Sequence, residues 1–312
     1  MKYGLYIRVD PFVELDFSNA SQKYKPTIQG DAVEITRKKN AGEFDADVPE
    51  YTHISSNKNQ RILITDDVAK TISHGVIVEC FTNCQIHYQL TSKAQALVKL
   101  PIIIIAHANS HVEFFGTIRP ENSHAVISRT ARVLEGARVD WNELHIGGDF
   151  IRAPYLNLLE KPEATGNIRV YSVARDEHKH DIYTESRHIA NHTNSDIITR
   201  SVLLDKSQTL SRGLVRIEKD AFGSQGYEKQ DALLLGEHAQ ADAIPNLEIQ
   251  NHDVSCSHGS TVGRIDQDAL FYLRSRGISL EQAQRLIIYS YFAPFLENQE
   301  SVAKILQEVL EL

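Results

Sequence analysis

Cysteine is scarce in this sequence, since three thiols among 312 residues are too few for a disulfide-stapled secreted framework. Positive charge is also in short supply: 33 Lys and Arg face 41 Asp and Glu, a formal net charge of −8 that argues against nucleic acid as the main partner. The start, MKYGLYIRVDPF, lacks the apolar core of a signal peptide, and the longest apolar run, residues 100–106, is too short for a membrane span. We therefore expect a cytoplasmic protein with reduced thiols and no membrane partner.

The common catalytic and nucleotide-binding signatures are missing as well. The chain has no G-x-x-x-x-G-K-[ST] phosphate loop, no G-x-G-x-x-G, no H-E-x-x-H and no G-x-S-x-G. These absences argue against a self-contained ATPase, dehydrogenase, zincin or α/β-hydrolase, so we expect a chain that is not an enzyme and binds no nucleotide itself.

Short strands dominate the part of the sequence that carries a pattern. Runs of three to five residues rich in β-branched, aromatic or other apolar residues alternate with Asn, Ser, His or Gly clusters. The expected strands are residues 61–65, 76–80, 96–100, 102–106, 112–115, 125–128, 168–171, 202–204, 213–217, 232–235 and 247–249. Either an antiparallel sandwich or barrel, or a parallel β-helix, suits this series. Because no Asn-Gly or Asp-Gly hairpin dipeptide occurs, we favour the parallel β-helix, although no strict repeat period is visible.

The pattern changes to helical after about residue 263. Residues 266–277 have an acidic start, basic residues in the last turn and Gly277 at the expected C-terminal stop. Ser279 and Gln282 match a capping box that opens a second helix, which should end near Pro294. A third helix is expected from the spacing of Val302, Ile305, Leu306, Val309 and Leu310. The predicted division is a small mixed N-terminal cap at 1–60, a β-helix at 61–262 and a helical region at 263–312.

Candidate metal ligands occur in two places. Cys256 and His258 are two residues apart, so on a strand they would point to one face and could bind one metal ion or cluster. Four histidines lie between residues 177 and 193, among them His180 and His188. Taken alone, the first pattern is better explained by a buried thiol beside a hydrogen-bonded histidine than by a metal site. The second is better explained by histidines with structural or surface roles. The Cys80 and Cys84 pair lacks the usual metal-knuckle spacing and is expected to be buried.

Residues 243–279, AIPNLEIQNHDVSCSHGSTVGRIDQDALFYLRSRGIS, closely resemble the C-terminal signature of the SufB/SufD family, the scaffold components of the SUF iron–sulfur cluster assembly system. DKSQTLSRGLVRI at 205–217 and DALLLGEHAQADAIPNLEI at 231–249 also match. The resemblance is dense over about residues 169–292 and thins toward the N-terminus.

The resemblance implies a right-handed parallel β-helix whose C-terminal helical region docks on the ABC-type ATPase SufC. It also implies a SufB–SufD heterodimer or a homodimer that forms through the β-helix and builds a transient iron–sulfur cluster at its interface. Cys256 and His258 match the family's C-S-H-G, whose His is a candidate ligand, and His180 and His188 fall in the matched stretch. Residues that would contact SufC lie on the first C-terminal helix: Leu270, Phe271, Tyr272 and Arg276.

The chain departs from each subtype of the family at particular positions. Gly259 stands where SufB-type sequences carry Glu, and Gln230 stands where they carry an interface Cys, whereas SRGLVRI at 211–217 is more similar to SufB. This mixture suits an undifferentiated member that forms a homodimer. The alternatives are a β-solenoid of another kind that binds a polymer, and a zinc site at Cys256 and His258.

Overall fold

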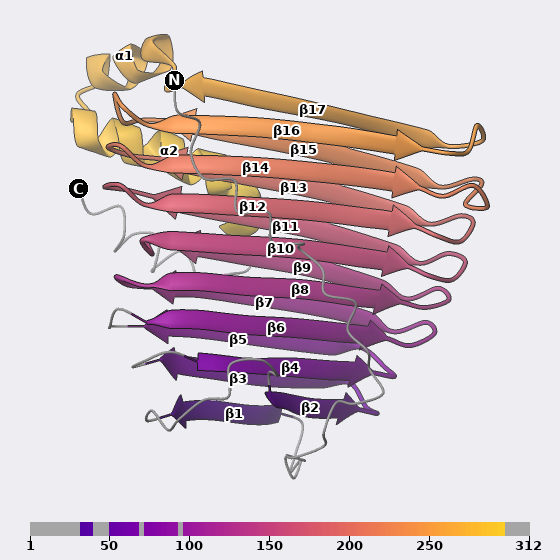
Figure 1. Cartoon of the computed structure of the whole chain (residues 1–312). Coiled ribbons are helices and arrows are strands. Elements are labelled where there is room, and N and C mark those ends of the chain that lie inside the picture. The colour runs from indigo at the N-terminus through magenta and orange to yellow at the C-terminus, as the bar shows by residue number, and fades with distance from the viewer. Residues whose placement is uncertain (1–31, 40–49, 69–71, 93–95, 297–312) are drawn as a thin grey trace, which may run out of the picture.

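The computed structural model describes residues 32–39, 50–68, 72–92 and 96–296, and these form a stack of parallel strands with two helices at its end (Figure 1). The strands are β1 Ala32–Lys39, β2 Glu50–Ser56, β3 Gln60–Val68, β4 Ile72–Cys80, β5 Cys84–Ser92, β6 Leu97–Ala106, β7 His111–Pro120, β8 His124–Val133, β9 Arg138–Ile146, β10 Phe150–Leu159, β11 Thr165–Ala174, β12 Lys179–His188, β13 Asn194–Leu203, β14 Gln208–Ile217, β15 Gln225–Leu234, β16 Gln240–Ile249 and β17 Ser255–Arg264. The helices are α1 Gln267–Ser275 and α2 Leu280–Leu296.

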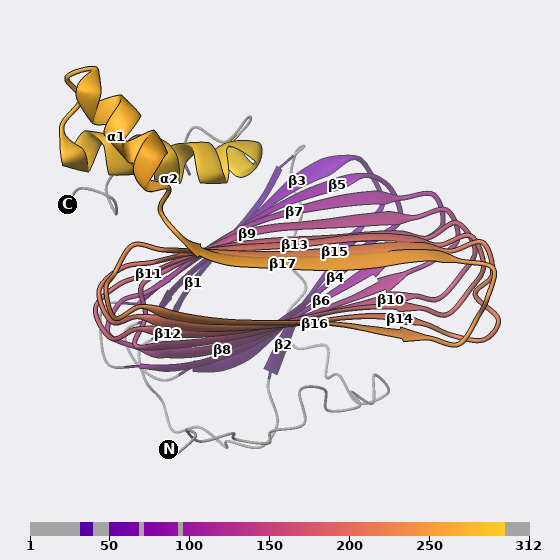
Figure 2. The ribbon, with the colours of Figure 1, turned by 90° about the horizontal axis from the view of Figure 1, so that it is seen from above.

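Successive strands alternate between two sheets, which makes the chain a parallel β-solenoid with two strands in each turn. Odd-numbered strands form one sheet in the order β1 to β17, and even-numbered strands form the other from β16 to β2. Every pairing is parallel, so the preference for a β-helix over a sandwich is confirmed and the lack of hairpin signals is explained. Figure 2 shows the two sheets facing each other along the stack.

The turns differ in length, which explains why no strict period is visible in the sequence. Gln60 pairs with Cys84, a spacing of 24 residues, whereas Gln208 pairs with Gln240, a spacing of 32. The additional residues of the longer turns lie in the loops between strands. The strands β1 and β2 precede residue 61, where the sequence analysis placed the start of the solenoid.

A proline accounts for one difference between the predicted and observed strands. The two strands predicted at 96–100 and 102–106 are a single strand, β6, that continues through Pro101. Proline has no backbone N–H, and the β4–β6 ladder is interrupted at this point, between the pairs Ser73↔Lys99 and Val76↔Ile102.

The side chains that point into the solenoid change character along its axis. In the first turns they are apolar and form one continuous core, to which the buried Cys80 and Cys84 belong as expected. From β11 onward, hydroxyls and histidines replace many of these side chains, and Thr199 Oγ1 and Ser211 Oγ lie 3.1 Å apart between the two sheets. The interior therefore becomes polar toward the C-terminal end of the stack.

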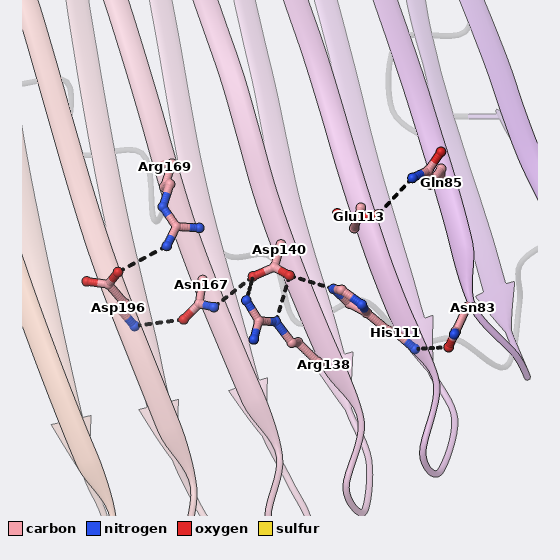
Figure 3. A network of polar contacts seen from close by, with 9 residues as sticks. All are labelled: Asn83, Gln85, His111, Glu113, Arg138, Asp140, Asn167, Arg169 and Asp196. Atoms are coloured by element: carbon pink, nitrogen blue, oxygen red, sulfur yellow. Dashed lines mark hydrogen bonds and ion pairs between the residues drawn. The ribbon is translucent and has the colours of Figure 1, made fainter. Parts of the chain in front are cut away.

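A ladder of polar contacts crosses the outer face of the odd-numbered sheet (Figure 3). Asp140 is at its centre and accepts hydrogen bonds from His111 at 2.6 Å, Arg138 at 2.7 Å and Asn167 at 2.7 Å. Burial alone would raise the pKa of Asp140, but these bonds outweigh it and hold the pKa below its ordinary value. Such contacts between neighbouring strands help to align the turns.

The helix α2 lies along the outer face of the same sheet, and α1 packs on α2 (Figure 2). Ile288 and Phe292 of α2 pack on a cluster that includes Tyr171 and Val202. The backbone N–H of Gln282 donates to Ser279 Oγ at 3.2 Å and the side chain of Gln282 accepts from the Ser279 N–H at 3.3 Å, so the predicted capping box is confirmed.

Both helices end close to the predicted positions. Asp266 caps α1, and Gly277 follows it with a φ of 86°. The helix α2 continues two residues beyond Pro294, and the third predicted helix, at 302–310, lies outside the described residues. Among the residues that the structure describes, no helix is both long enough and apolar enough to span a bilayer.

Candidate functional site

The solenoid ends in an exposed pair of strands, β16 and β17, which we call the open end (Figure 1). Within the described residues, each strand has a hydrogen-bonded neighbour on one side only, β14 for β16 and β15 for β17. Interior positions that are buried in other turns are exposed here, and Ile249 and Val262 are 43% and 44% exposed. An unpaired edge with exposed apolar side chains is a surface that readily pairs with another chain.

Cys256 lies at the open end, half-buried against the last residues of the core. Its partner on β15 is Gly226, and a Cβ added to Gly226 would stand 2.5 Å from Val215 Cγ1, 3.3 Å from Cys256 Sγ and 3.5 Å from His188 Nε2. The absence of a side chain at Gly226 thus lets the Cys256 thiol and the His188 imidazole approach the same point of the backbone, beside Val215. Burial, together with the negative charge of Glu228, raises the pKa of Cys256 to about 11, so its thiol is neutral at neutral pH.

Hydrogen bonds fix the orientation of His188. Its Nδ1 lies 2.8 Å from Thr193 Oγ1, and that hydroxyl donates to the Ala190 carbonyl at 3.1 Å. Because Thr193 has given its proton to the carbonyl, it accepts from Nδ1–H, and the lone pair of Nε2 accepts a hydrogen bond from Ser195 Oγ at 2.8 Å. A histidine whose second nitrogen donates to a protein oxygen is the usual arrangement of a metal ligand.

His258 and Glu228 are aligned on adjacent strands of the odd-numbered sheet. They are register partners, so both point to the interior side, and His258 is exposed at the open end while Glu228 is fully buried beneath it. Glycine at position 213 on the opposite sheet makes room for this carboxylate, since a Cβ there would stand 1.4 Å from Glu228 Oε1. Burial raises the pKa of Glu228 to about 7, although bonds from Gln230 and the Asn246 backbone partly oppose the rise.

His180 lies far from this group. It shares the inward face of β12 with His188, but eight residues at about 3.3 Å each separate the two side chains. The Nε2–H of His180 donates to the Gly147 carbonyl at 2.8 Å, and Nδ1 accepts from Ser172 at 3.1 Å. The structure therefore brings Cys256, His188, His258 and Glu228 to one end and leaves His180 in a separate hydrogen-bonded position.

The buried His180 predicts a specific loss of stability in acid. Burial lowers its pKa to about 3 from an ordinary value of 6.5, so the folded chain cannot take up the proton that the unfolded chain accepts as the pH falls below 6.5. At about pH 5 this difference costs about 2 kcal/mol of unfolding free energy. We expect His180→Gln to lose less stability between about pH 7.5 and 5 than the wild type in thermal melts. Equal losses would contradict the assignment, and the exposed His252→Gln serves as control.

The residues predicted on α1 divide into a buried group and an exposed group. Leu270 is 7% exposed and packs between α1 and α2, with Leu273 partly buried beside it. Phe271 and Tyr272 are 73% and 57% exposed, and the Arg276 guanidinium lies 5.3 Å from the Tyr272 ring centroid. Phe271 also lines a hollow between the helices together with Arg274, Ser275, Gly277, Ile278, Ser279, Leu280 and Gln282.

Sequence reasoning did not identify Glu228, Gly226 or Gly213 as parts of the open end. The sequence shows that Gly226 and Glu228 would share one face of a strand. It does not show that Cys256 and His258 of β17 are paired with them. Because the turns vary from 24 to 32 residues, the pairing of Glu228 with His258 cannot be obtained from a fixed period.

Comparison with known proteins gives one consistent result. The SUF system FeS cluster assembly SufBD core domain matches residues 61–291. SufD of Escherichia coli is 30% identical over 213 residues, which are 68% of this chain and 50% of that protein. A SufBD family protein of Staphylococcus saprophyticus is 27% identical over 261 residues, 82% of this chain and 54% of its own length. SufD of Bacillus subtilis is 34% identical over 148 residues, 47% of this chain and 34% of its length.

The chain thus spans about half, or less, of the length of these curated relatives. The matched core domain covers the solenoid from β3 onward, all of α1, and α2 as far as residue 291. The protein therefore belongs to the SufB/SufD family of the SUF system for iron–sulfur cluster assembly.

Proposed function

We propose that the chain is a scaffold subunit, without catalysis of its own, on which a transient iron–sulfur cluster is built at the open end. Family membership supports the general role, and one observation supports the location: Cys256 Sγ and His188 Nε2 both approach Gly226, beside a sheet edge that is unpaired within the described residues. Thiolate sulfur and imidazole nitrogen are ligands that iron–sulfur clusters use.

Dimerisation would complete the site. The edges β16 and β17 offer unpaired backbone groups together with exposed apolar side chains such as Ile244 and Val262. In a homodimer a two-fold axis would bring two copies of Cys256 and His258 to one interface, and a SufB/SufD-type heterodimer would pair one copy with a related subunit. A site with so few thiolates would hold its cluster weakly, as release to an acceptor requires.

A SufC-type ABC ATPase would supply the energy by docking on α1. The exposed Phe271 and Tyr272 provide an apolar surface beside the cationic Arg276, whereas Leu270 serves mainly to anchor the helix. Within the described residues both helices contact the same sheet as Cys256, so movement of α1 or α2 could be transmitted to β17 through the short connection at Ile265.

Charge reversal at Arg276 tests the docking surface. We expect Arg276→Glu to reduce the amount of SufC-type ATPase that co-purifies by about tenfold. The substitution reverses the charge of this exposed position and removes the contact of Arg276 with the Tyr272 ring. Lys161→Glu, on an exposed turn of the solenoid, provides the matched control. Undiminished co-purification of the Arg276 variant would exclude this residue from the interface.

The two alternatives make different predictions. Polymer-binding solenoids use exposed aromatic stacks, but Trp141, the one tryptophan, is fully buried inside the solenoid. A zinc site at Cys256 and His258 uses the same two side chains, so metal analysis must decide. Reconstitution of the purified chain with ferrous iron and sulfide under anaerobic conditions should produce visible cluster absorbance, and a colourless chain that retains zinc would refute the proposed function.

A further inference from the structure

A carboxylate that no described Lys or Arg neutralises is buried on β15, directly beneath the open end. Glu228 is 0% exposed, and in the described residues no Lys or Arg forms an ion pair with it. The carboxylate accepts hydrogen bonds from Gln230 Nε2, at 2.6 Å to Oε1, and from the Asn246 backbone, whereas Oε2 has no hydrogen-bond partner among the described residues. Carboxylates are seldom buried without a cation or a metal, because the loss of hydration is costly.

The surroundings of this carboxylate are built to hold it in place. Gly213, on the facing strand β14, is the position whose side chain would occupy the space of Glu228 Oε1 and of Gln230 Nε2. Gln230 Oε1 also lacks a partner, so two polar oxygens remain unsatisfied in the same interior layer. A purely structural role for Glu228 does not explain why both oxygens stay unpaired.

The positions of Cys256 and His258 indicate what these groups could bind. His258 lies directly above Glu228 in register, and Cys256 lies above Gly226, two residues from Glu228 along the same face. We propose that Glu228 is an oxygen ligand of a ferrous ion that Cys256 and His258 bind from the turn above. This inference rests on the proposed function and adds to it a carboxylate ligand from within the same protomer.

The chemistry of the three groups suits ferrous iron, which accepts thiolate, imidazole and carboxylate ligands. When iron binds, an Fe–S bond replaces the S–H bond of Cys256, the proton passes to solvent and the iron remains ferrous. In the described residues no three metal-ligating side chains already surround one point, so the exposed His258 and the half-buried Cys256 would turn inward onto the metal. The carboxylate of Glu228 offsets one of the two charges of the ion.

An anaerobic titration of the full chain with ferrous iron alone tests the assignment. Glu228→Gln keeps the shape and the bond to Gln230 but removes the charge, and we expect it to weaken iron binding by about tenfold or more. Glu228→Asp, which retracts the oxygen by one methylene, should also weaken it. Glu237→Gln, an exposed carboxylate in the turn after β15, should bind iron as the wild type does.

Cobalt(II), used as a spectroscopic probe, distinguishes the loss of one metal ligand from the loss of the whole metal site. In Glu228→Gln the near-ultraviolet band from Cys256 to cobalt should persist while the visible ligand-field bands shift; in Cys256→Ala the near-ultraviolet band should vanish. Wild-type iron affinity with an unchanged cobalt spectrum in Glu228→Gln would overturn the role of Glu228 and leave the proposed function intact. Wild-type iron binding in Cys256→Ala would instead overturn the proposed site itself.

Discussion

Replacing Cys256 with alanine is expected to abolish the iron–sulfur absorbance that the wild type develops with iron and sulfide. Cys256 is the one described thiol at the open end, whereas Cys80 and Cys84 are buried in the first turns. Removal of a thiolate ligand should lower the cluster yield by about tenfold or more. Because Cys256 is half-buried at the edge of the core, the melting temperature should change little.

Cys84→Ala is the matched control for that experiment, since it removes a thiol from the opposite end of the solenoid. It should destabilise the chain more than Cys256→Ala and leave the cluster yield per folded molecule unchanged. A full cluster yield from Cys256→Ala would remove this residue from the site, whatever the behaviour of the control.

The second large effect is expected at an ion pair inside the solenoid. Arg129 and Glu143 are both fully buried, and the Arg129 guanidinium donates from Nε to Glu143 Oε1 at 2.8 Å and from Nη2 to Oε2. Burial alone would raise the pKa of Glu143, but the Arg129 charge outweighs it and keeps the pKa below its ordinary value. Arg129→Met leaves the Glu143 charge without its partner, and we expect about 3–5 kcal/mol less unfolding free energy.

Denaturant titration can show whether the loss of stability depends on the burial of the ion pair. Arg132, three residues further along β8, forms a 2.7 Å ion pair with Glu160 on the outer face, where both side chains are partly exposed. Arg132→Met should cost about 1 kcal/mol or less. The double variant Arg129→Met with Glu143→Met should recover much of the single variant's loss. A cost at Arg129 no larger than that at Arg132 would contradict the account of the buried pair.

The general architecture could be predicted because its signals are local. Closely spaced strands without hairpin dipeptides indicated a parallel β-helix, and the Ser279 and Gln282 spacing indicated the start of α2. The predicted strands were too short, however. Each covers only the apolar part of an observed strand, and no strand was predicted in β1, β2, β5, β9, β10, β12 or β17. Polar residues such as those of the Asp140 ladder carry no strand signal of their own.

The candidate site could be predicted only in part, because it depends on which residues are stacked on one another. Cys256 and His258 share a face through their spacing along one strand, as the sequence indicated. The approach of His188 and the burial of Glu228 depend on pairings between strands, set by loops of unequal length. His180 and His188, which the sequence puts in one group of four histidines, lie near opposite ends of β12.

The most direct test of the central claim is metal and sulfide analysis of the chain co-expressed with its SufC-type ATPase and purified without oxygen. If the open end builds a transient cluster, the wild-type complex carries iron and acid-labile sulfide, and the Cys256→Ala complex carries neither while still binding the ATPase. Iron and sulfide retained in full by the Cys256→Ala complex, or zinc in place of iron in the wild type, would contradict the account.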